Sequence, residues 1–591
     1  MLIKNKKLLF ISILLGLFST YSFQFFLLPE TNIIWLLIFI SITVLFYKTL
    51  SAKHSVPVKI VSIIIGILYS LMVFLGYELR KSGGIDLYPM VLISFLGLSL
   101  FFAIALIRVF SYLLSTQIIL DTTKNIQLKR IIFVAFVLLI CWLPVLLSCF
   151  PGNLTSDSFG EIRQQLGMSP LSNQHTVMHQ FFIKICLSIG RLFGDLQSGI
   201  IVYTIFQMAF AAFTFSYCIE YLRHKGCRKV FLIIVFLFFA FYPLNSFYSV
   251  SMIKDEPFAC ITVLLLIALF EELNEAHLPN TKSHFFRIAI IVLLSFLFCT
   301  IRNNGFYAFV LGFIFIIIFN FKDLKRLLLI FCSTLILAFG YNYLIFNVLG
   351  AEKSESGEML GIPLQMLARV VDKENPDLES EDFQILNEVI PDYDIFSRNY
   401  LPDNSDPIKG HGVFLPDVFD RNPKRYLSSW IKIGLKYPVV YMEAFLFHTQ
   451  GYWDPGISTC SIPAYVYQPN DFHITQNTRF ESVKYSILNA VYRIAEYSPA
   501  SLLFSIGFLV MIYLFCFAFL ILQHRLHEAS VLFLLAFLWL TAIAAPTCLS
   551  QYAYGLTASL PLIVSLTLEH PISSYYRRYL NYFQPETIRG I

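Results

Sequence analysis

Apolar stretches that recur along most of the chain constrain its fold more than any other feature of the sequence. Many of them run for about twenty residues, the length that an α-helix needs to cross the ~30 Å hydrocarbon core of a bilayer. Hydrophobic residues make up 57% of the chain and charged residues 14%, whereas a soluble domain has about a quarter of its residues charged. The pattern predicts an all-α polytopic membrane protein embedded in a lipid bilayer.

The links between these stretches set the expected topology. Lysine and arginine gather in alternate links, for example at Lys53 and Lys59 and again at Lys129 and Arg130, and such links stay on the cytoplasmic side. Both termini are therefore expected in the cytoplasm, and the residues after Phe150 outside. The net charge of +5 comes largely from these links and calls for no nucleic acid partner. We expect about fourteen transmembrane helices, at residues 8–28, 33–48, 59–78, 88–111, 131–149, 199–222, 230–246, 257–273, 285–301, 305–320, 327–349, 499–522, 530–548 and 552–568.

Two further apolar blocks are expected to lie along the membrane surface instead of crossing it. Residues 176–193 are followed by a link too short and too poor in basic residues for a cytoplasmic turn, and residues 431–448 contain Lys436, Pro438 and Glu443. The chain then divides into four regions. They are N-terminal helices (1–129), a membrane core (130–349) with an external loop at 150–198, an external domain of mixed α/β or α-rich structure (350–497), and C-terminal helices with a cytoplasmic tail (498–591).

The loop after Phe150 is polar and rich in turn residues, with a short helix expected from Ser156 to Leu166. On such a helix Asp157 and Glu161 share one face with Gln164 or Gln165, because residues four and seven or eight apart lie on the same side. Apolar residues point elsewhere, and this amphipathic pattern suits a membrane interface.

Other polar groups gather at the same expected side of the membrane. They are His175 and His179, the run Lys254–Asp255–Glu256, and the run Arg302–Asn303–Asn304. Helix ends that converge on one face could form a site for a charged, lipid-borne substrate. The alternative is that charges simply collect where helices meet water.

Three motifs together resemble the bacterial GT-C glycosyltransferases. They are FPG–x(3)–SDS–x(5)–Q–x(n)–H–x(3)–H from residue 150, YP–x(7)–SMIKDEPF from residue 242, and RNNG from residue 302. These relatives are multi-spanning enzymes that take a sugar from a polyprenyl-phosphate carrier. The chain departs from their usual plan in two ways: four helices precede the helix that normally comes first, and Asp157–Ser158 stands where many relatives have two adjacent acids.

The resemblance implies that Asp157 is the catalytic carboxylate, which would activate an acceptor hydroxyl as a general base. The alternative is that Asp157 only caps the helix that follows. Asp255 and Glu256 would help to bind a divalent cation, Mg²⁺ or Mn²⁺, or orient the acceptor, and Lys254 would contact phosphate. The alternative for this run is a mutual Lys–Asp pair at a helix start. Substrate contacts are expected from Glu161, Gln165, His175, His179, Lys254, Arg302 and Asn303.

Some of these assignments compete with simpler explanations. Arg302 suits a phosphate leaving group because it binds bidentately, but it could also extend to the membrane interface. His175 and His179, four residues apart, would share a helix face, yet zinc needs three or four ligands and no third is evident. In the external domain, glycan contacts could come from Arg369, His411, His448, Tyr452 and Trp453.

The expected function is hexosyl or pentosyl transfer at the outer face of a bacterial plasma membrane. The donor would be a polyprenyl-phosphate-linked sugar and the acceptor a cell-envelope glycan or teichoic-type polymer. An alternative function is that of a polysaccharide polymerase or ligase that uses a lipid-linked glycan as donor. In that case arginines of the external domain would be more important for activity than Asp157. A membrane transporter, which favours broken helices and paired charges near the midplane, and a non-catalytic assembly partner also stay open.

Overall fold

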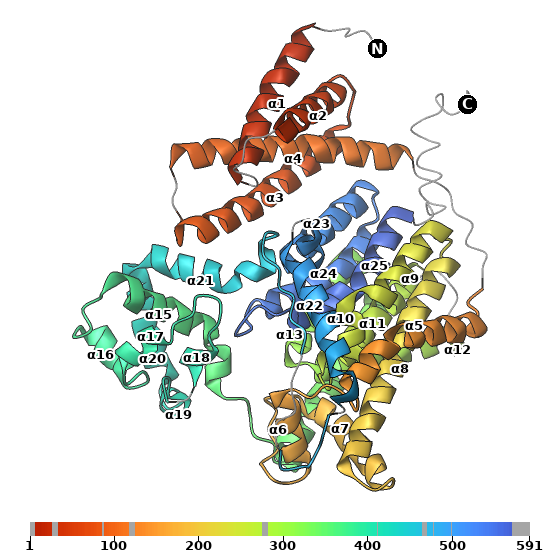
Figure 1. The fold of residues 1–591 in the computed structure, drawn as a ribbon, viewed down its shortest axis with the longest axis vertical. Helices are drawn as coiled ribbons and strands as arrows, with labels where there is room; N and C mark the ends of the chain where they lie inside the picture. The colour runs from red at the N-terminus through yellow and green to blue at the C-terminus, as the bar shows by residue number, and fades with distance from the viewer. Residues whose placement is uncertain are drawn as a thin grey trace.

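The structure is a computed structural model that describes residues 6–569 except 27–32, 86–87, 117–124, 275–281, 411, 464–469, 477 and 498. Within these residues the regular elements are all helices, joined by loops that pair only through isolated bridges (Figure 1). The all-α prediction is confirmed for this part of the chain. The C-terminal tail that was expected in the cytoplasm lies outside the described residues.

The first four helices form a layer of their own, at the top of Figure 1. α3 and α4 pack along each other, and α1 packs against both α2 and α4. The layer joins the rest of the molecule chiefly where α3 meets α23 (Ile506–Leu522), around buried aromatic residues such as Phe110 and Phe519. The four helices are α1 (Lys6–Phe26), α2 (Ile33–Leu50), α3 (Val56–Ser82) and α4 (Pro89–Ser115).

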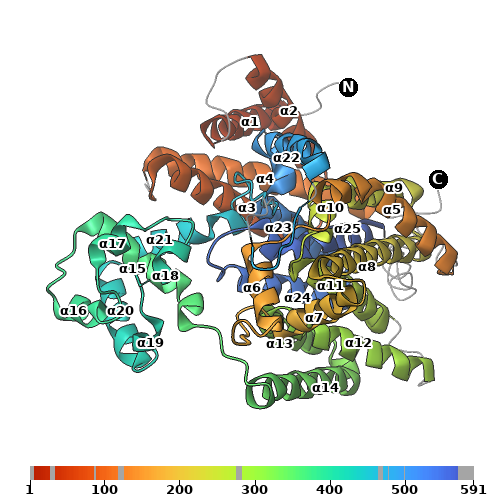
Figure 2. The ribbon, with the colours of Figure 1, turned by 60° about the horizontal axis from the view of Figure 1, so that its bottom comes forward.

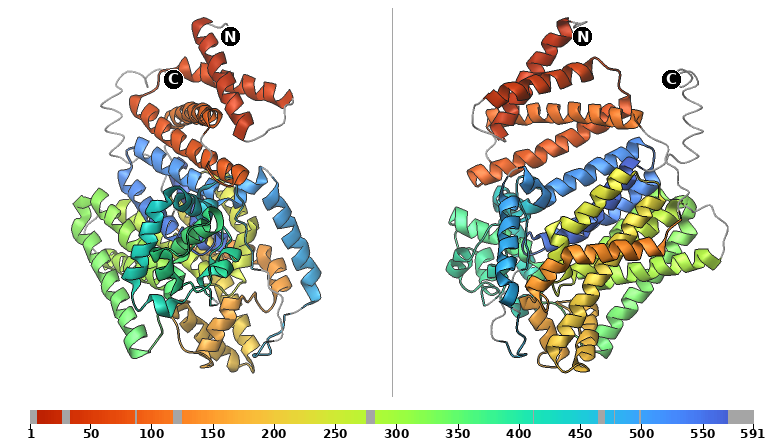
Figure 3. Two further views of the ribbon diagram at one scale, coloured as in Figure 1. Left: turned by 90° about the vertical axis from the view of Figure 1, so that its left-hand side faces the viewer. Right: turned by 45° about the vertical axis from the view of Figure 1, so that its right-hand side comes forward.

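The central bundle holds the largest hydrophobic core of the molecule, which includes Trp142, Phe215 and Phe239. Its helices run roughly side by side in the right-hand view of Figure 3. The closest packing is between α13 and α24, with α11 held between α8, α12 and α25. Together with α23 they are α5 (Leu128–Cys149), α8 (Leu196–His224), α9 (Lys229–Phe241), α10 (Pro243–Ser249), α11 (Asp255–Asn274), α12 (Lys282–Ile301), α13 (Asn303–Phe319), α14 (Leu324–Tyr343), α24 (Leu526–Ala542) and α25 (Tyr554–Glu569).

Two short helices, α6 (Ser156–Gln165) and α7 (Val177–Arg191), cover one end of this bundle, at the bottom of Figure 1. α7 folds back on α8, and the two helices approach so closely at Gly190 that a Cβ there would lie 2.0 Å from the backbone nitrogen of Gly199. With 15 residues α7 is short for a span, and the surface position expected for residues 176–193 stays a prediction.

The helices from α15 to α21 form the helical domain on the left of Figure 1, and the whole region 350–497 is helical where it is described, so the α-rich alternative applies to it. The domain has its own core, built around Phe383, Phe396 and Phe414. The block 431–448 is not one helix, because Pro438 begins a new helix after Tyr437. The α-helices of this region are α15 (Gly361–Glu374), α16 (Glu381–Asn387), α17 (Tyr393–Arg398), α18 (Asp406–Lys409), α19 (Pro416–Phe419), α20 (Pro423–Lys436), α21 (Pro438–Trp453) and α22 (Glu481–Glu496). α22 stands apart from the others, along the side of the bundle (Figures 2 and 3).

Six helical stretches among the described residues are long and apolar enough to cross a bilayer: α1, α3, α4, α5, α8 and the stretch Phe321–Val348 that contains α14. A seventh is possible where α9 and α10 follow each other with a bend of 50°. The span expected at 230–246 is thus broken in the structure: Pro243 starts a new helix because its ring disfavours continuation of the preceding one. Five other apolar helices are shorter. The fold is consistent with a helical multi-pass membrane protein but does not support the count of about fourteen spans.

Candidate functional site

The loop before α6 and the loop before α11 pair through their backbones and so bring two sequence motifs together. The Asn153 amide donates to the carbonyl of Val250 at 2.8 Å, and the Met252 amide donates to the carbonyl of Asn153 at 2.8 Å. The Ser158 hydroxyl adds a bond to the Met252 carbonyl at 2.7 Å. The start of α6 is thereby fixed beside the residues that lead into α11.

Two more loops, from distant parts of the chain, close the arrangement. The Tyr248 hydroxyl donates to the Ser461 carbonyl at 2.7 Å and lies 2.8 Å from the Ser550 hydroxyl. The Ser550 hydroxyl oxygen accepts from the Ser461 amide at 3.0 Å. Four chain segments therefore meet at the end of the bundle that α6 covers.

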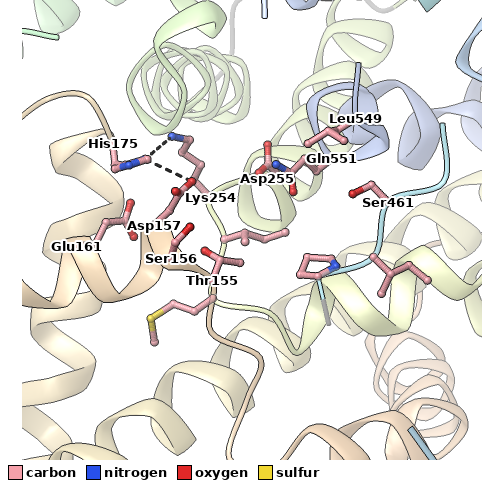
Figure 4. Close-up of a pocket in the computed structure, with 14 residues that line it drawn as sticks. Thr155, Ser156, Asp157, Glu161, His175, Lys254, Asp255, Ser461, Leu549 and Gln551 are labelled. Carbon is pink, nitrogen blue, oxygen red and sulfur yellow. Dashed lines mark hydrogen bonds and ion pairs between the residues drawn. The ribbon is translucent and has the colours of Figure 1, made fainter. Parts of the chain in front are cut away.

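A cavity of about 170 Å³ lies between these segments (Figure 4). In Figure 4 the side chains of Asp157, Glu161, His175 and Lys254 gather on one side, and Asp255 lies on the other side beside Gln551. The lining residues are Thr155, Ser156, Asp157, Glu161, His175, Met252, Ile253, Lys254, Asp255, Ser461, Ile462, Pro463, Leu549 and Gln551.

Asp157 is the most open carboxylate of the cavity, with 60% of its side chain exposed. It does not cap α6. Thr155 is the N-cap: its hydroxyl accepts from the Ser158 amide at 3.2 Å, while the Ser158 hydroxyl accepts from the Thr155 amide at 2.9 Å. The capping alternative for Asp157 is therefore wrong, and its carboxylate faces the cavity.

His175 turns one edge of its ring toward both Asp157 and Lys254 (Figure 4). Its Nδ1 is 3.2 Å from the Lys254 ammonium and 3.9 Å from the Asp157 carboxylate. Burial, and then the positive charge of Lys254, lower the pKa of His175, and the nearby carboxylates only partly offset this. Near neutral pH His175 is therefore neutral, with Nδ1 accepting a hydrogen bond from Lys254.

Glu161, which lines the cavity, forms a buried pair with His179 behind it. The His179 Nδ1 lies 3.0 and 3.1 Å from the two carboxylate oxygens, and both side chains are almost fully buried. Burial alone would raise the pKa of Glu161, but the attraction and hydrogen bond of His179, helped by Lys254 and His175, outweigh it and lower the pKa. Glu161 is therefore ionised.

Arg302 and Asp255 form a second buried pair at the cavity floor. Their charged atoms are 2.8 Å apart, and about a tenth or less of each side chain is exposed. The guanidinium lies between the rings of Phe258 and Tyr552, at 5.7 and 5.4 Å from their centres, and donates to the Tyr552 carbonyl. Arg302 is thus held inside the protein, and extension to the membrane interface does not describe it.

Asp255 and Glu256 do not converge on a common point. Asp255 borders the cavity and pairs with Arg302, whereas Glu256 is fully buried against Tyr554 and Cys260 in the bundle. Successive helical residues point about 100° apart, so neighbours at a helix start face different surroundings. No cluster of three or more His, Cys, Asp or Glu with metal-binding geometry occurs in the described ranges. The residues expected to hold Mg²⁺ or Mn²⁺ therefore do not fit that role as a pair, and we derive no step through a cation.

Two of the predicted site residues, Gln165 and Asn303, do not line the cavity. The Gln165 amide donates to Gln180 at 2.9 Å, and Asn303 bonds to Asn173 on an exposed surface. His175 and His179 do not share a helix face, because α7 begins only at Val177. They reach the same region from a loop and from a helix, respectively.

The residues proposed for glycan contact in the external domain are mostly engaged elsewhere. Arg369 pairs with Glu443 at 2.7 Å and lies over the Phe447 ring. His448 and Tyr452 are buried, Trp453 bonds to Thr449, and His411 is outside the described residues.

Sequence reasoning missed the wall formed by Ser461, Leu549 and Gln551. The available signal was topological: residues 546–551 are a polar interruption between two apolar stretches, on the side expected to be external. Nothing in the local pattern indicated that Ser461, nearly a hundred residues away, would lie against it.

The fold and the cavity define a class: a helical, multi-pass membrane protein with a charged pocket where loops converge at one end of its bundle. Residues 167–573, more than half of the chain, match the model of a family of unknown function, DUF6020, and the chain belongs to this family. The matched part includes His175, Lys254, Asp255 and Arg302, but begins after Asp157 and Glu161. Comparison with curated proteins and with solved structures found no match.

Proposed function

We propose that the protein is a membrane glycosyltransferase of GT-C type, which moves a sugar from a polyprenyl-phosphate carrier to a cell-envelope glycan or teichoic-type polymer. One observation carries the proposal: a single cavity holds an open carboxylate, Asp157, and a cation, Lys254, which both approach Nδ1 of the neutral His175. These are the two functional groups that sugar transfer from a lipid phosphate needs.

The charges around the cavity support this division of roles. Glu161 is balanced by His179 and Asp255 by Arg302, each within 3.1 Å. Asp157 and Lys254 each reach His175 instead, which is neutral near neutral pH. The cavity can therefore accept a hydroxyl at Asp157 and a phosphate at Lys254 without breaking a buried pair.

The reaction follows from these positions. The acceptor hydroxyl oxygen attacks the anomeric carbon, and its proton passes to the Asp157 carboxylate. The bond between the anomeric carbon and the phosphate oxygen breaks, and polyprenyl phosphate leaves with the electron pair. Lys254 stabilises the charge that develops on the leaving phosphate. Direct displacement of this kind inverts the anomeric centre, as the resemblance implies.

The placement of basic residues favours an external site. α11 begins at the cavity with Asp255, and at its far end Glu271 pairs with Lys225 and Glu272 with Arg326. Basic residues mark cytoplasmic helix ends, so the cavity opens on the outer face of a plasma membrane and the termini are cytoplasmic.

The test is turnover in proteoliposomes that contain a panel of polyprenyl-phosphate sugars and envelope glycans, with release of polyprenyl phosphate as the readout. Asp157→Asn is expected to lower kcat at least 100-fold, in the range of a lost general base. Asp471→Asn is the matched control, since Asp471 is also about half exposed but pairs with Arg163 outside the cavity. If the Asp157 variant turns over as fast as wild type, Asp157 is not the general base and the reaction takes place at another site.

One observation favours a second candidate, a transporter. α9 and α10 are bent by 50° at Pro243, directly before the loop that reaches the cavity, and broken helices are common at transport sites. Movement of a lipid-linked sugar across sealed proteoliposomes without release of polyprenyl phosphate would support transport. A requirement for a whole lipid-linked glycan as donor would instead indicate the polymerase or ligase.

A further inference from the structure

A chain of buried hydrogen bonds leads from the cavity into α8 and fixes where its protons lie. It runs from Glu161 through His179 and Tyr203 to Gln207. All four side chains are at most 3% exposed. Tyr203 and Gln207 belong to a helix that crosses the bundle and were not among the residues expected in the site.

The direction of each bond can be assigned from the far end. Three backbone carbonyls, of Tyr248, Ser249 and Ser251, lie 2.6–3.2 Å from one end of the Gln207 amide. Only the NH₂ group can face three acceptors, so the Gln207 carbonyl oxygen points to Tyr203. An amide oxygen cannot donate, so the Tyr203 hydroxyl gives its single proton to Gln207, at 2.6 Å.

The same logic then fixes His179. Because the Tyr203 proton is already used, its oxygen must accept from the His179 Nε2–H, at 2.8 Å. The His179 Nδ1 lies almost equally close to both oxygens of Glu161, at 3.1 and 3.0 Å. A forked contact of this kind suits an N–H that donates to a carboxylate, since a protonated carboxyl would direct one oxygen at a bare nitrogen.

We infer that His179 is held as an imidazolium, paired with an ionised Glu161, and that Tyr203 and Gln207 are positioning residues that keep it so. The other charged and titratable groups that face the pair are His175 and Lys254 on the cavity side and the Tyr203 hydroxyl on the α8 side.

Two consequences follow for the pocket. The Glu161 carboxylate is oriented as a fixed hydrogen-bond acceptor, suited to a hydroxyl of a bound sugar and not to proton transfer. The chain also ties α8 to the carbonyls just before Met252–Asp255, so one set of bonds holds two walls of the cavity. The charge assignment is independent of the transferase proposal, whereas the role of Glu161 toward a sugar rests on it.

The test is ¹⁵N NMR of the full chain, labelled at histidine and reconstituted in nanodiscs at pH 8, with the His179 signal identified by its loss in His179→Gln. The wild type is expected to show both His179 nitrogens protonated, a result that needs no further variant. A neutral His179 ring in the wild type would overturn the inference, whether or not the protein transfers sugar.

Tyr203→Phe tests the role of the chain. It removes the acceptor of the Nε2–H, and loss of a hydrogen bond to a charged group is expected to lower the imidazolium-to-neutral ratio about tenfold or more. Tyr513→Phe is the matched control, because Tyr513 also donates from a buried hydroxyl, to the Leu556 carbonyl, far from the pair in the chain. An unchanged imidazolium in Tyr203→Phe would show that Tyr203 does not hold the charge.

Discussion

The buried pair of Asp255 and Arg302 offers the sharpest prediction about what holds the cavity together. Both side chains are almost fully buried, and the guanidinium is also packed between two aromatic rings. Removing one partner of a buried pair leaves an uncompensated charge and costs about 3–5 kcal/mol. We therefore expect Asp255→Asn and Arg302→Met each to lower the free energy of unfolding by about that amount.

The double variant separates pairing from packing. Asp255→Asn/Arg302→Met leaves no buried charge, so its cost is expected to fall at least 2 kcal/mol short of the sum of the two single costs, a coupling in the range seen for contacting residues. Arg302→Lys keeps the charge but loses the planar contact with both rings, and an intermediate cost of about 0.5–2 kcal/mol follows from the lost cation–π contacts.

The assay is unfolding in mixed detergent micelles as the fraction of sodium dodecyl sulfate is raised, followed by tryptophan fluorescence. The control is the pair of Arg425 and Glu388, whose side chains are 45% and 42% exposed. An exposed pair contributes about 0–1 kcal/mol, so the corresponding variants should differ little from wild type. Single-variant costs below about 1 kcal/mol at Asp255 and Arg302, or strictly additive costs, would refute the reasoning.

Four further predictions concern the site and the helices that cover it. Thr155→Ala removes the cap of α6 and should cost about 0.5–2 kcal/mol, visible as faster hydrogen exchange of the α6 amides, while unchanged exchange would contradict the capping role. Lys254→Met removes a charge that lowers the pKa of His175, so the NMR titration of His175 should shift to higher pH, and no shift would contradict the contact. Because the folded-state pKa of His175 lies below its ordinary value, protonation favours the unfolded chain, and its contribution to stability is lost as pH falls from about 6.5. Gly190→Ala should destabilise the protein by about 1–3 kcal/mol, because its Cβ would meet the α8 backbone, whereas Gly160→Ala on α6 has open space and should be tolerated in the same thermal-unfolding assay.

Much of the helical layout follows from local pattern alone. Apolar stretches predict helices such as α5 and α8 because their residues bury or face lipid along their whole length. The spacing of Asp157 and Glu161 also predicts a shared helix face, and both residues line the cavity. These predictions share one cause: the features they concern depend on residues that lie within one or two helical turns of each other in the sequence.

The errors have a different origin. The expected shared face of His175 and His179 assumed that one helix holds both, but Thr176 is the N-cap and the helix starts after it. Asp255 and Glu256 are adjacent in sequence, yet one faces the cavity and the other Tyr554, a difference set by the rotation of α11 within the bundle. The chain through Tyr203 depends on contacts between separate helices, which spacing along one segment cannot specify.

The most direct test of the central claim is to find where a lipid-phosphate sugar binds. A polyprenyl-phosphate sugar that carries a photoreactive group on the sugar should label the segments that line the cavity, namely 155–161, 252–255, 461–463 and 549–551. Excess unmodified donor should abolish the labelling, and Lys254→Met should weaken it by about tenfold or more, the loss expected for a charge-assisted contact to phosphate. Labelling confined to the helices from α15 to α21 (residues 361–453), or labelling that unmodified donor does not reduce, would contradict a transferase site at this cavity.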